Sequence, residues 1–562
     1  MSVTLASITP PPFPRITPPG GSHATVVLTP DEEMLCTLLD ECTTALRETR
    51  PELDPIECRI AGGWVRDKLL GKESNDIDIA LSSIMGIAFA ELFVPFLEDR
   101  GIQVRNVTKI ASNPEQSKHL ETCTATLMGM GIDFVNLRSE EYATGSRIPT
   151  KVEYGTPLQD ALRRDLTINA LFYNVHTRSV EDHTGKGLDD LRDGIARTPL
   201  PPRETFLDDP LRVLRSIRFA SRFGFELDHS LKEAVKDHEV KDALVTKVSR
   251  ERVGTEIDKM FKGRDPLYSM RLVHELAAHE EIFLLPASAK PSPEPENRRT
   301  SLVAMTLLSA ALSESSLPRL PPISPRLTAH AKSDLGMRCR LYFASALTPF
   351  RKSQCPEKKN KLAPAAEVVI REGLKVGNQN HYLSGIPLLL QSHKILSRPT
   401  LDRFNGAPSL RVVIGLTLRD KCISNAYTEA HWTSTTLFCL IQDLVDLWDM
   451  EKDELDVARA SELIEVYNVF AAKVDELELE NAIHAPPILD GNDVCKLLGA
   501  SPGAWMTGAL AKVVEWQLGH PDGTKADCQS WLQGEVDSGK VVVGDPRRSH
   551  DDGGNKKKKL KT

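Results

Sequence analysis

The sequence lacks three features that would assign it to a specialised class of protein. It contains no apolar run near the roughly 20 residues that a membrane-spanning helix needs. Its ten cysteines are scattered without the paired spacing of a metal site, which favours a reducing compartment over a disulfide scaffold. It has no basic excess, because 70 Lys and Arg residues face 78 Asp and Glu residues, a formal charge of −8. Any contact with RNA must therefore come from a local basic surface.

The first thirty residues also lack acidic side chains, since the first one is Asp31. They are rich in proline, serine and threonine, and we predict a disordered leader over residues 1–30. A mitochondrial presequence shares this composition but usually carries several arginines, whereas Arg15 is alone here. We predict a second disordered segment, a basic tail, over residues 541–562. The alternative interpretation of its lysine run is a nuclear-import signal. The expected compartment is the mitochondrion, with nuclear and cytoplasmic forms left open.

Residues 57–81 combine a glycine turn with a pair of carboxylates. The pattern predicts a short strand, a turn at Gly62-Gly63, a short helix and a second strand. Asp76 and Asp78 alternate with apolar residues in that second strand, so both carboxylates project from one face. Neighbouring carboxylates repel each other unless a cation lies between them, and Mg²⁺ prefers such oxygen ligands. Each feature alone is commonly a solvated turn, but their combination predicts a nucleotide-transfer site that uses Mg²⁺.

A predicted helix that opens at Asp209 carries three arginines on one side. An aspartate followed by a proline is a standard helix opening, with the carboxylate as N-cap. Asp209, Arg212, Arg215 and Arg218 then recur at every third position. A solvated basic face is the common interpretation of such a helix. Stacked arginines repel one another, however, and an anion lying across them would relieve that repulsion.

These motifs together resemble those of the DNA-polymerase-β-like nucleotidyltransferases. The Gly-Gly-Trp-Val-Arg-Asp sequence at 62–67 is similar to the branch that contains the eukaryotic class II CCA-adding enzymes, the tRNA nucleotidyltransferase and poly(A) polymerase family. Residues 163–169 match that family's Arg-Arg-Asp-x-Thr-x-Asn motif. Residues 208–212 match its Glu-Asp-x-x-Arg motif, except that Asp208 replaces the glutamate. Looser similarity to the family's hinge, neck and eukaryotic tail extends the resemblance over about residues 57–530.

The resemblance implies a role for each motif. The carboxylates of Asp76 and Asp78 would be catalytic and would hold Mg²⁺. The residues expected to bind the nucleotide are Gly63, Arg66, Arg164, Asp165, Asp209, Arg212, Arg215 and Arg218. Within this set, Gly63, Arg66 and Arg164 would bind the triphosphate and Asp165 the ribose, while Arg215 and Arg218 would assist. Asp209 and Arg212 would read the base edge, since a carboxylate accepts from the amino group of cytosine or adenine.

The resemblance also implies an α+β fold. We expect a polymerase-β-like nucleotidyltransferase head, a mixed sheet with helices, over residues 31–200. An all-α neck with the base-reading helix would follow over residues 201–270. Residues 271–540 would form a helical body and tail that bind tRNA, interrupted by Pro/Ser-rich inserts such as 286–325. Asp133, on a strand expected beside the carboxylate strand, is left open as a third metal ligand.

The expected function is template-independent addition of CCA to the 3′ end of tRNA, with CTP and ATP as substrates and release of pyrophosphate. The expected partner is tRNA, without a membrane. A CC-only or A-only adding enzyme and a poly(A) polymerase would carry the same motifs. A different class, a catalytically inactive tRNA-binding protein on this scaffold, is disfavoured because the acidic pair and the base readers are all present.

Overall fold

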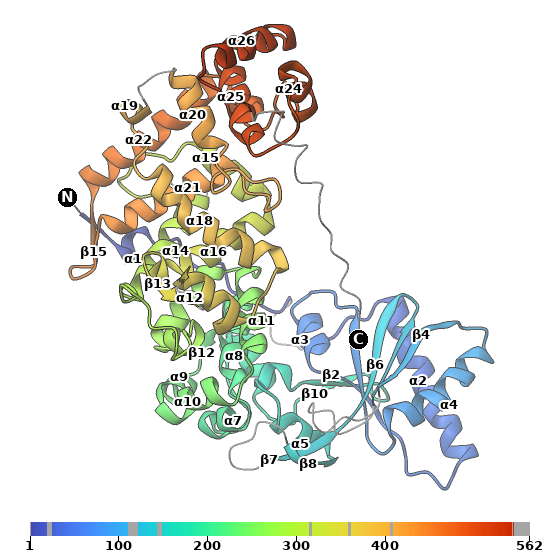
Figure 1. Cartoon of the computed structure of the whole chain (residues 1–562). Helices are drawn as coiled ribbons and strands as arrows, with labels where there is room; N and C mark the ends of the chain where they lie inside the picture. Colours follow the sequence, from blue (N-terminus) through green and yellow to red (C-terminus); the bar gives the residue numbers. More distant parts are fainter. Residues whose placement is uncertain are drawn as a thin grey trace, which may run out of the picture. The chain divides into compact units, whose positions relative to one another are not determined.

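The computed structural model describes residues 2–19, 25–110, 122–142, 149–313, 317–357, 361–404, 409–541 and 543 (Figure 1). The chain forms two compact units. The first, here called the sheet unit, consists of Pro10–Thr306 and Ser345–Leu383. The second, the helical unit, consists of Met1–Thr9, Leu307–Ala344 and Ser384–Thr562. The segment predicted as one body, 271–540, is thus divided between the two units. Within the described residues, no helix combines the length and apolar character that crossing a bilayer requires.

A seven-stranded sheet forms the core of the sheet unit and confirms the expected α+β fold (Figure 1). The strand order is β10-β9-β2-β3-β6-β5-β4. The bounds are β2 (Cys58–Ala61), β3 (Asp76–Leu81), β4 (Val104–Ile110), β5 (Thr122–Leu127), β6 (Met130–Asn136), β9 (Phe172–Asn174) and β10 (Ser179–Glu181). The pair β3–β6 is parallel and the other pairs are antiparallel, so the sheet is mixed, as predicted.

The alternating sequence of β3 determines which of its side chains reach the core. Ile77, Ile79 and Leu81 are fully buried, so the intervening residues project from the opposite face of the strand. Helices α2 (Pro30–Thr49), α3 (Gly63–Leu69) and α4 (Gly86–Glu98) accompany this sheet. Helix α4 packs Phe89 against Phe134 of β6, with ring centroids 5.4 Å apart. The buried aromatic contact holds the strand that neighbours the carboxylate strand.

The sheet unit continues into short elements and then into the helical neck. Its remaining strands are β7 (Arg138–Tyr142), β8 (Pro149–Tyr154), β11 (Ile195–Ala196), β12 (Glu226–Leu227), β13 (Gln354–Pro356) and β14 (Leu362–Pro364). Its helices up to the first boundary between the units are α5 (Pro157–Leu162), η2 (Thr167–Asn169), α6 (Gly187–Asp193), α7 (Pro202–Asp208), α8 (Leu211–Phe223), α9 (His229–Lys236), α10 (His238–Thr246), α11 (Arg250–Phe261), α12 (Pro266–Glu275) and α13 (His279–Ile282). The later ones are η3 (Thr348–Phe350), α17 (Ala365–Val368), η5 (Val369–Leu374) and η6 (Gln379–His381).

The helical unit contains one small sheet and many helices. The sheet consists of β1 (Ser2–Thr4), β16 (Glu454–Asp456) and β15 (Trp448–Asp449). The helices are α1 (Leu5–Ile8), α15 (Pro325–Ser333), α19 (Leu401–Phe404), α20 (Leu410–Leu418), α21 (Trp432–Asp446), α22 (Val457–Glu476), α23 (Leu479–Ala482), α24 (Gly491–Leu498), α25 (Trp505–Gly519) and α26 (Lys525–Asp537). Three further helices contain the boundaries between the units: α14 (Arg299–Leu312), α16 (Leu335–Ala346) and α18 (Tyr382–Leu396).

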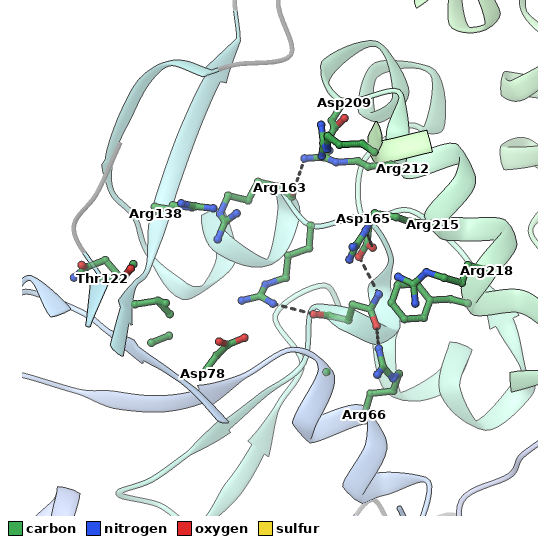
Figure 2. Close-up of a pocket in the computed structure, with 18 of the residues that line it drawn as sticks. Arg66, Asp78, Thr122, Arg138, Arg163, Asp165, Asp209, Arg212, Arg215 and Arg218 are labelled. Atoms are coloured by element: carbon green, nitrogen blue, oxygen red, sulfur yellow. Dashed lines mark hydrogen bonds and ion pairs between the residues drawn. The ribbon is translucent and has the colours of Figure 1, made fainter. Parts of the chain in front are cut away.

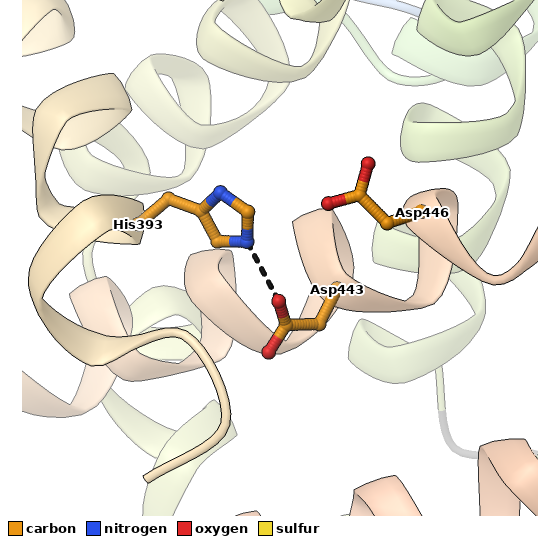
Figure 3. A group of neighbouring side chains, drawn as sticks. All are labelled: His393, Asp443 and Asp446. Carbon is orange, nitrogen blue, oxygen red and sulfur yellow. Dashed lines mark hydrogen bonds and ion pairs between the residues drawn. The ribbon is translucent and has the colours of Figure 1, made fainter.

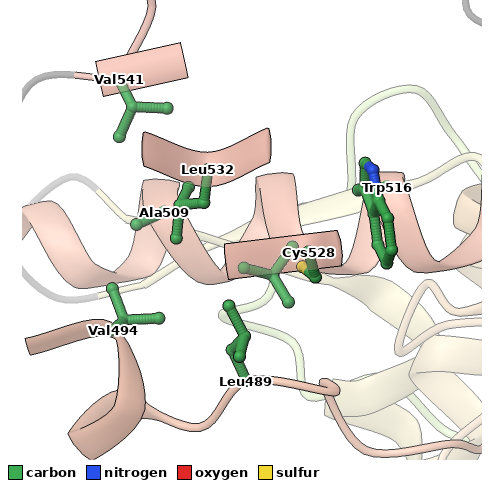
Figure 4. Packing of buried hydrophobic residues seen from close by; sticks show 8 residues of the cluster. Leu489, Val494, Ala509, Trp516, Cys528, Leu532 and Val541 are labelled. Carbon is green, nitrogen blue, oxygen red and sulfur yellow. The ribbon is translucent and has the colours of Figure 1, made fainter. Parts of the chain in front are cut away.

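The last three helices share an apolar cluster of their own (Figure 4). Trp516 of α25 and Leu532 of α26 pack with Leu489 and Val494 at the start of this region. Val541 joins the same cluster, so order extends to the first residue of the predicted basic tail. The lysine run of that tail lies outside the described residues.

The structure differs from the predicted disordered leader, residues 1–30, within residues 2–19, whereas residues 1 and 20–24 of that leader lie outside the described residues. Strand β1 pairs antiparallel with β16, and Val3 stands opposite Leu455 with only 3% of its surface exposed. Further along, in the sheet unit, the Ile16 amide donates to the Phe223 carbonyl at 3.0 Å. The composition of this segment did not predict strand β1, because a few apolar residues among prolines and hydroxyl side chains are sufficient for one short strand that extends an existing sheet.

We expect Val3→Asp to destabilise the helical unit. The new carboxylate would lie in an apolar position without a cation, at a cost of about 3 kcal/mol. Thermal unfolding followed by circular dichroism should therefore show a lower midpoint than in the wild type. Ala6→Asp, at an exposed position of α1, is the matched control and should leave the midpoint unchanged. Equal midpoints for the two variants would contradict the packing described here.

A second difference concerns the Pro/Ser-rich segment predicted as a loop at 286–325. Residues Arg299–Leu312 form α14, in which Val303, Met305 and Leu308 are fully buried. The flanking prolines obscured an apolar stretch of helical length.

Two neighbouring histidines, the buried His279 and the half-buried His274, make the stability of the sheet unit sensitive to acid. Burial lowers the pKa of His279 to about 3 and that of His274 to about 4, and their rings lie 5.3 Å apart. The unfolded chain binds these protons near pH 6.5, whereas the folded chain does not, so stability is present above that pH and is lost below it. We expect His279→Leu to reduce the fall in unfolding midpoint between pH 7 and pH 4. An unchanged pH slope in this variant would contradict the assignment.

Candidate active site

Three carboxylates lie on neighbouring positions of β3 and β6. In the parallel register Asp78 is paired with Asp133, and Asp76 with Gly131. Burial raises the pKa of Asp78 to about 6; the positive charge of Arg164 opposes this, and the negative charges of Asp76 and Asp133 add to it. The pKa of Asp133 is also raised, by burial and then by Asp76. Neighbouring carboxylates that oppose one another's ionisation favour the binding of a hard divalent cation between them. Asp133 interacts with the other two carboxylates and belongs to the same cluster.

The glycine turn brings the backbone up against an arginine. Gly62 has φ +71°, which favours glycine, and its N–H donates to the Leu171 carbonyl at 2.9 Å. A Cβ at this position would lie 2.5 Å from Nη1 of Arg164. The turn thus limits where that guanidinium can lie.

We expect Gly62→Ala to lower kcat/KM for the nucleotide by about 10²-fold, because displacing a positioned group by about 1 Å has effects of that order. The methyl group would both strain the backbone and push Arg164 away. Steady-state kinetics would measure the effect. Gly101→Ala is the control, because Gly101 also has a positive φ (+75°) but its added Cβ would meet nothing within 4 Å. If both variants keep wild-type kinetics, the close approach at Gly62 is unimportant.

Arg164 is held by an aspartate that the sequence analysis did not select. Its Nε and Nη2 donate to Oδ2 of Asp160 at 3.0 and 2.9 Å, and its Nη1 donates to the Asn169 carbonyl at 3.2 Å. Asp160 is 1% exposed. Burial opposes the ionisation of Asp160, but the positive charges of Arg164 and Arg163 outweigh it and lower the pKa of this carboxyl group to about 2. This fork-like pairing orients the guanidinium before any substrate binds.

Asp165 connects the arginine motif to the neck helix. Its Oδ1 accepts from Nδ2 of Asn169 and its Oδ2 from Nε of Arg215, at 2.9 and 2.7 Å (Figure 2). Despite its burial, the positive charge of Arg215 and these hydrogen bonds lower the pKa of Asp165. Asn169 also accepts a hydrogen bond from Arg66, which lies against the rings of Phe219 and Phe223. A continuous polar network therefore runs from α3 to α8.

Helix α8 begins one residue later than the sequence predicted. Its first residue is Leu211, and Pro210 rather than Asp209 occupies the N-cap position. The Asp209 carboxylate still accepts from the Leu211 N–H at 3.2 Å. Its other oxygen pairs with Nη2 of Arg252 on α11, also at 3.2 Å. The Arg252 partner fixes this carboxylate from a second helix.

Three arginines of α8, namely Arg212, Arg215 and Arg218, each have a different partner. Arg212 donates through Nη2 to the Arg163 carbonyl at 2.6 Å. Arg215 pairs with Asp165, and Arg218 pairs through Nε with Glu256 of α11 at 2.5 Å. The three guanidiniums are thus spread along the helix by separate acceptors, which agrees with the predicted basic side of α8 (Figure 2).

These side chains surround one cavity of about 540 Å³. The predicted site residues that line this cavity, called the nucleotide cavity after that prediction, are Gly63, Arg66, Asp78, Arg164, Asp165, Asp209, Arg212, Arg215 and Arg218. Asp76 is exposed at the start of β3 and does not belong to this lining. Further polar or aromatic lining residues, which the prediction did not select, are Thr122, Asn136, Arg138, Arg163, Asn169, Phe219, Arg222 and Arg252. Among these, Arg163 and Asn169 stand inside the Arg-Arg-Asp motif, and Arg252 stands in the segment 201–270 that was predicted as the neck.

A group of possible metal ligands in the helical unit has a structural explanation. His393, Asp443 and Asp446 lie together (Figure 3). The Asp443 carboxylate accepts hydrogen bonds from His393 Nε2, Ser397 Oγ, the Arg398 amide and the Tyr467 hydroxyl, all at 2.7–2.8 Å. With four protein donors on two oxygens, this carboxylate is already satisfied and links α18, α21 and α22.

Comparisons with known proteins agree with this arrangement. The Poly A polymerase head domain family matches residues 58–197, and a second family, the probable RNA and SrmB-binding site of polymerase A, matches residues 224–290. Among solved structures, the Thermotoga maritima CCA-adding enzyme complexed with tRNA aligns with a TM-score of 0.55 at 18% identity, covering 91% of this chain and 96% of that chain. This likeness shows a shared fold.

Sequence relatives extend over nearly the whole chain. The mitochondrial CCA tRNA nucleotidyltransferase of Saccharomyces cerevisiae is 36% identical over 531 residues, covering 90% of this chain and 93% of the relative. A tRNA nucleotidyltransferase of Schizosaccharomyces pombe is 31% identical, covering 91% and 99%. With such identity along both full lengths, the chain belongs to the eukaryotic CCA tRNA nucleotidyltransferase family.

Proposed function

We propose that this protein adds CCA to the 3′ end of tRNA, using CTP and ATP and releasing pyrophosphate. The observation that carries the proposal is the lining of the nucleotide cavity, in which Asp78 and the pair Asp209–Arg212 belong to one continuous space. A carboxylate for a metal and a donor–acceptor pair for a base are the two functions that such a transfer requires. The family relationship supports the same activity.

Asp76 and Asp78, with Asp133 beside them, would hold Mg²⁺. The bound ion would stabilise charge on the reacting and leaving oxygens. The pKa values of Asp78 and Asp133, which are raised by burial and further by neighbouring carboxylates, support the assignment. In the reaction, the 3′-hydroxyl oxygen of tRNA bonds to the α-phosphorus, the bond to the bridging oxygen breaks and pyrophosphate leaves. The carboxylate pair accepts the hydroxyl proton, and the arginines orient the phosphates.

Base choice follows from the donor and acceptor pattern of Asp209 and Arg212. The Asp209 carboxylate accepts from the exocyclic amine of cytosine or adenine, and Arg212 donates to a ring acceptor. Guanine and uracil carry a carbonyl oxygen in place of that amine, which a carboxylate repels. Gly63, Arg66 and Arg164 bind the triphosphate, Asp165 stands near the ribose, and Arg215 and Arg218 neutralise phosphate charge.

The activity is tested with purified protein, Mg²⁺ and a tRNA that ends before CCA, supplied with labelled CTP, ATP or both. Sequencing gels should show extension by three nucleotides that requires both triphosphates. Arrest after two cytidines would show a CC-adding enzyme, and long adenosine tails a poly(A) polymerase. Tight tRNA binding without extension would support an inactive binding protein instead.

We also propose a mitochondrial location, because the Saccharomyces cerevisiae relative is named as mitochondrial. Nuclear and cytoplasmic forms belong to the same proposal. A fluorescent fusion at the carboxyl end, imaged with a mitochondrial dye, would test it. Exclusion of the fusion from mitochondria would contradict it.

A further inference from the structure

A second cavity, of about 570 Å³, borders the nucleotide cavity and is strongly basic. Its six cations come from the turn after α3, from α8, and from α11 and the residues after it: Lys72, Arg218, Arg222, Lys259, Lys262 and Arg264. The other lining residues among those the structure describes are Ser221, Met260 and Gly263, so no carboxylate contributes to this part of the wall. A concave surface with one sign of charge concentrates anions.

The positive charge in this second cavity is only partly compensated. Acidic residues pair with four of the cations. Glu256 pairs with Arg218 at 2.5 Å and with Lys259 at 3.8 Å, Asp258 pairs with Lys262 at 2.8 Å, and Asp67 pairs with Arg222 at 3.5 Å. Lys72 differs, because its pKa is lowered by burial and then by the positive charge of Arg222, with Arg264 adding to the effect and Asp67 opposing it. The cations on this side of the cavity therefore repel one another, and an anion between them would relieve that repulsion.

Arg264 provides a second, independent indication of an anionic ligand. Its Nη2 donates to the Pro14 carbonyl at 2.9 Å, and its guanidinium lies over the Phe13 ring. Its Nη1 is buried and has no hydrogen-bond partner. A buried N–H group without an acceptor is costly, and a phosphate oxygen in the cavity would supply one.

The two cavities share two residues of α8. Arg218 and Arg222 line both the nucleotide cavity and the second cavity. They are four residues apart and so lie about one helical turn, roughly 6 Å, from each other along one side of α8. An anion that moves between the cavities can therefore remain in contact with a guanidinium throughout.

We propose that the second cavity receives the pyrophosphate that nucleotide addition releases, with Arg218 and Arg222 contacting it on the way and Lys72 and Arg264 binding it. This inference rests on the proposed function, which identifies the released anion. A compact polyphosphate matches the cavity better than an RNA backbone, because RNA carries one charge per nucleotide whereas pyrophosphate concentrates several charges on two adjacent phosphorus atoms. Binding there separates the product from the site of the next nucleotide.

The test compares Lys72→Gln and Arg264→Gln with the wild-type full chain. Neither residue belongs to the nucleotide cavity, and Lys236→Gln, an exposed residue of α9, is the matched control. Isothermal titration calorimetry with inorganic pyrophosphate measures binding directly and needs no turnover. Product inhibition of CTP addition by pyrophosphate gives the kinetic counterpart. We expect each variant to weaken both by about tenfold, while KM for CTP and for tRNA changes less than twofold.

Several outcomes would overturn the proposal. Unchanged pyrophosphate affinity in both variants, with wild-type thermal unfolding, would show that the cavity does not bind this product. A raised KM for tRNA with unchanged pyrophosphate affinity would show that it binds RNA phosphates instead. If the wild type adds no nucleotide, the proposed function fails, whereas calorimetry still decides whether the cavity binds pyrophosphate. Lys72→Arg, which keeps the charge, should retain binding; loss in this variant as well would also count against the proposal.

Discussion

Asp78→Ala is expected to reduce nucleotide addition by a factor on the order of 10³ or more, a loss typical of removing preorganised charge stabilisation from a transition state. Among the carboxylates on β3 and β6, Asp78 is the one that lines the nucleotide cavity, and its pKa is raised to about 6. Its removal would leave Asp76 and Asp133 as the remaining ligands for a cation. Single-turnover extension of a tRNA that lacks CCA would measure the change in rate.

Two comparisons make this prediction specific. Asp133→Asn should cause a smaller loss, because Asp133 stands opposite Asp78 in the register and contributes charge from β6. Raising the Mg²⁺ concentration should partly restore the rate of Asp133→Asn but not that of Asp78→Ala. An Asp78→Ala protein that extends tRNA at the wild-type rate would disprove the metal-binding role.

Asp209→Ala is expected to lower the preference for CTP over UTP by about 10- to 100-fold, the range that one base-reading contact contributes. The alanine removes both the acceptor for the amino group of cytosine and the repulsion of the uracil carbonyl. Competition between labelled CTP and UTP on one tRNA would measure the ratio of kcat/KM values. The ratio should fall because addition of CTP becomes slower and exclusion of UTP becomes weaker.

Asp208→Ala is the matched control for this change. Asp208 precedes Asp209 in the chain, ends α7 and is not part of the nucleotide-cavity lining. It should therefore retain the CTP preference. Arg252→Gln should give an intermediate result, since Arg252 holds the Asp209 carboxylate at 3.2 Å. Equal CTP preference in Asp209→Ala and the wild type would exclude base reading by this carboxylate.

Local motifs predicted about half of the residues that line the nucleotide cavity, because each motif combines several functional residues within a few positions. Asp78, Arg164 and Arg212 were identified in this way, and the structure brings them to one cavity. Partners on distant elements could not be identified from spacing. Asp160 and Arg252 act on motif residues through folded contacts that the order of residues does not reveal.

Local sequence patterns likewise predicted only part of the fold. Strands such as β3 and β6 followed from their alternating apolar residues, whose buried faces can be read from a period of two, whereas the mixed sheet was implied by the family resemblance. The ordered residues 2–19 were missed because a strand at a sheet edge depends on a partner far along the chain, here Leu455 for Val3. Helix α14 was missed because prolines on both sides outweighed its apolar interior.

The pairing of β1 with β16 also has a consequence for folding during synthesis. Ser2 hydrogen-bonds to Glu454, 452 positions later, and the helical unit is assembled from three separate stretches of chain. At about 5–20 residues per second, the ribosome needs roughly 20–90 seconds to make the partner strand after β1 emerges. During that interval Val3 has no β16 to pair with, whereas residues 10–306 of the sheet unit are made before β16. Strand β1 is thus synthesised long before its partner and is among the last elements to reach its final place, which predicts a nascent chain that depends on chaperones until β16 has emerged.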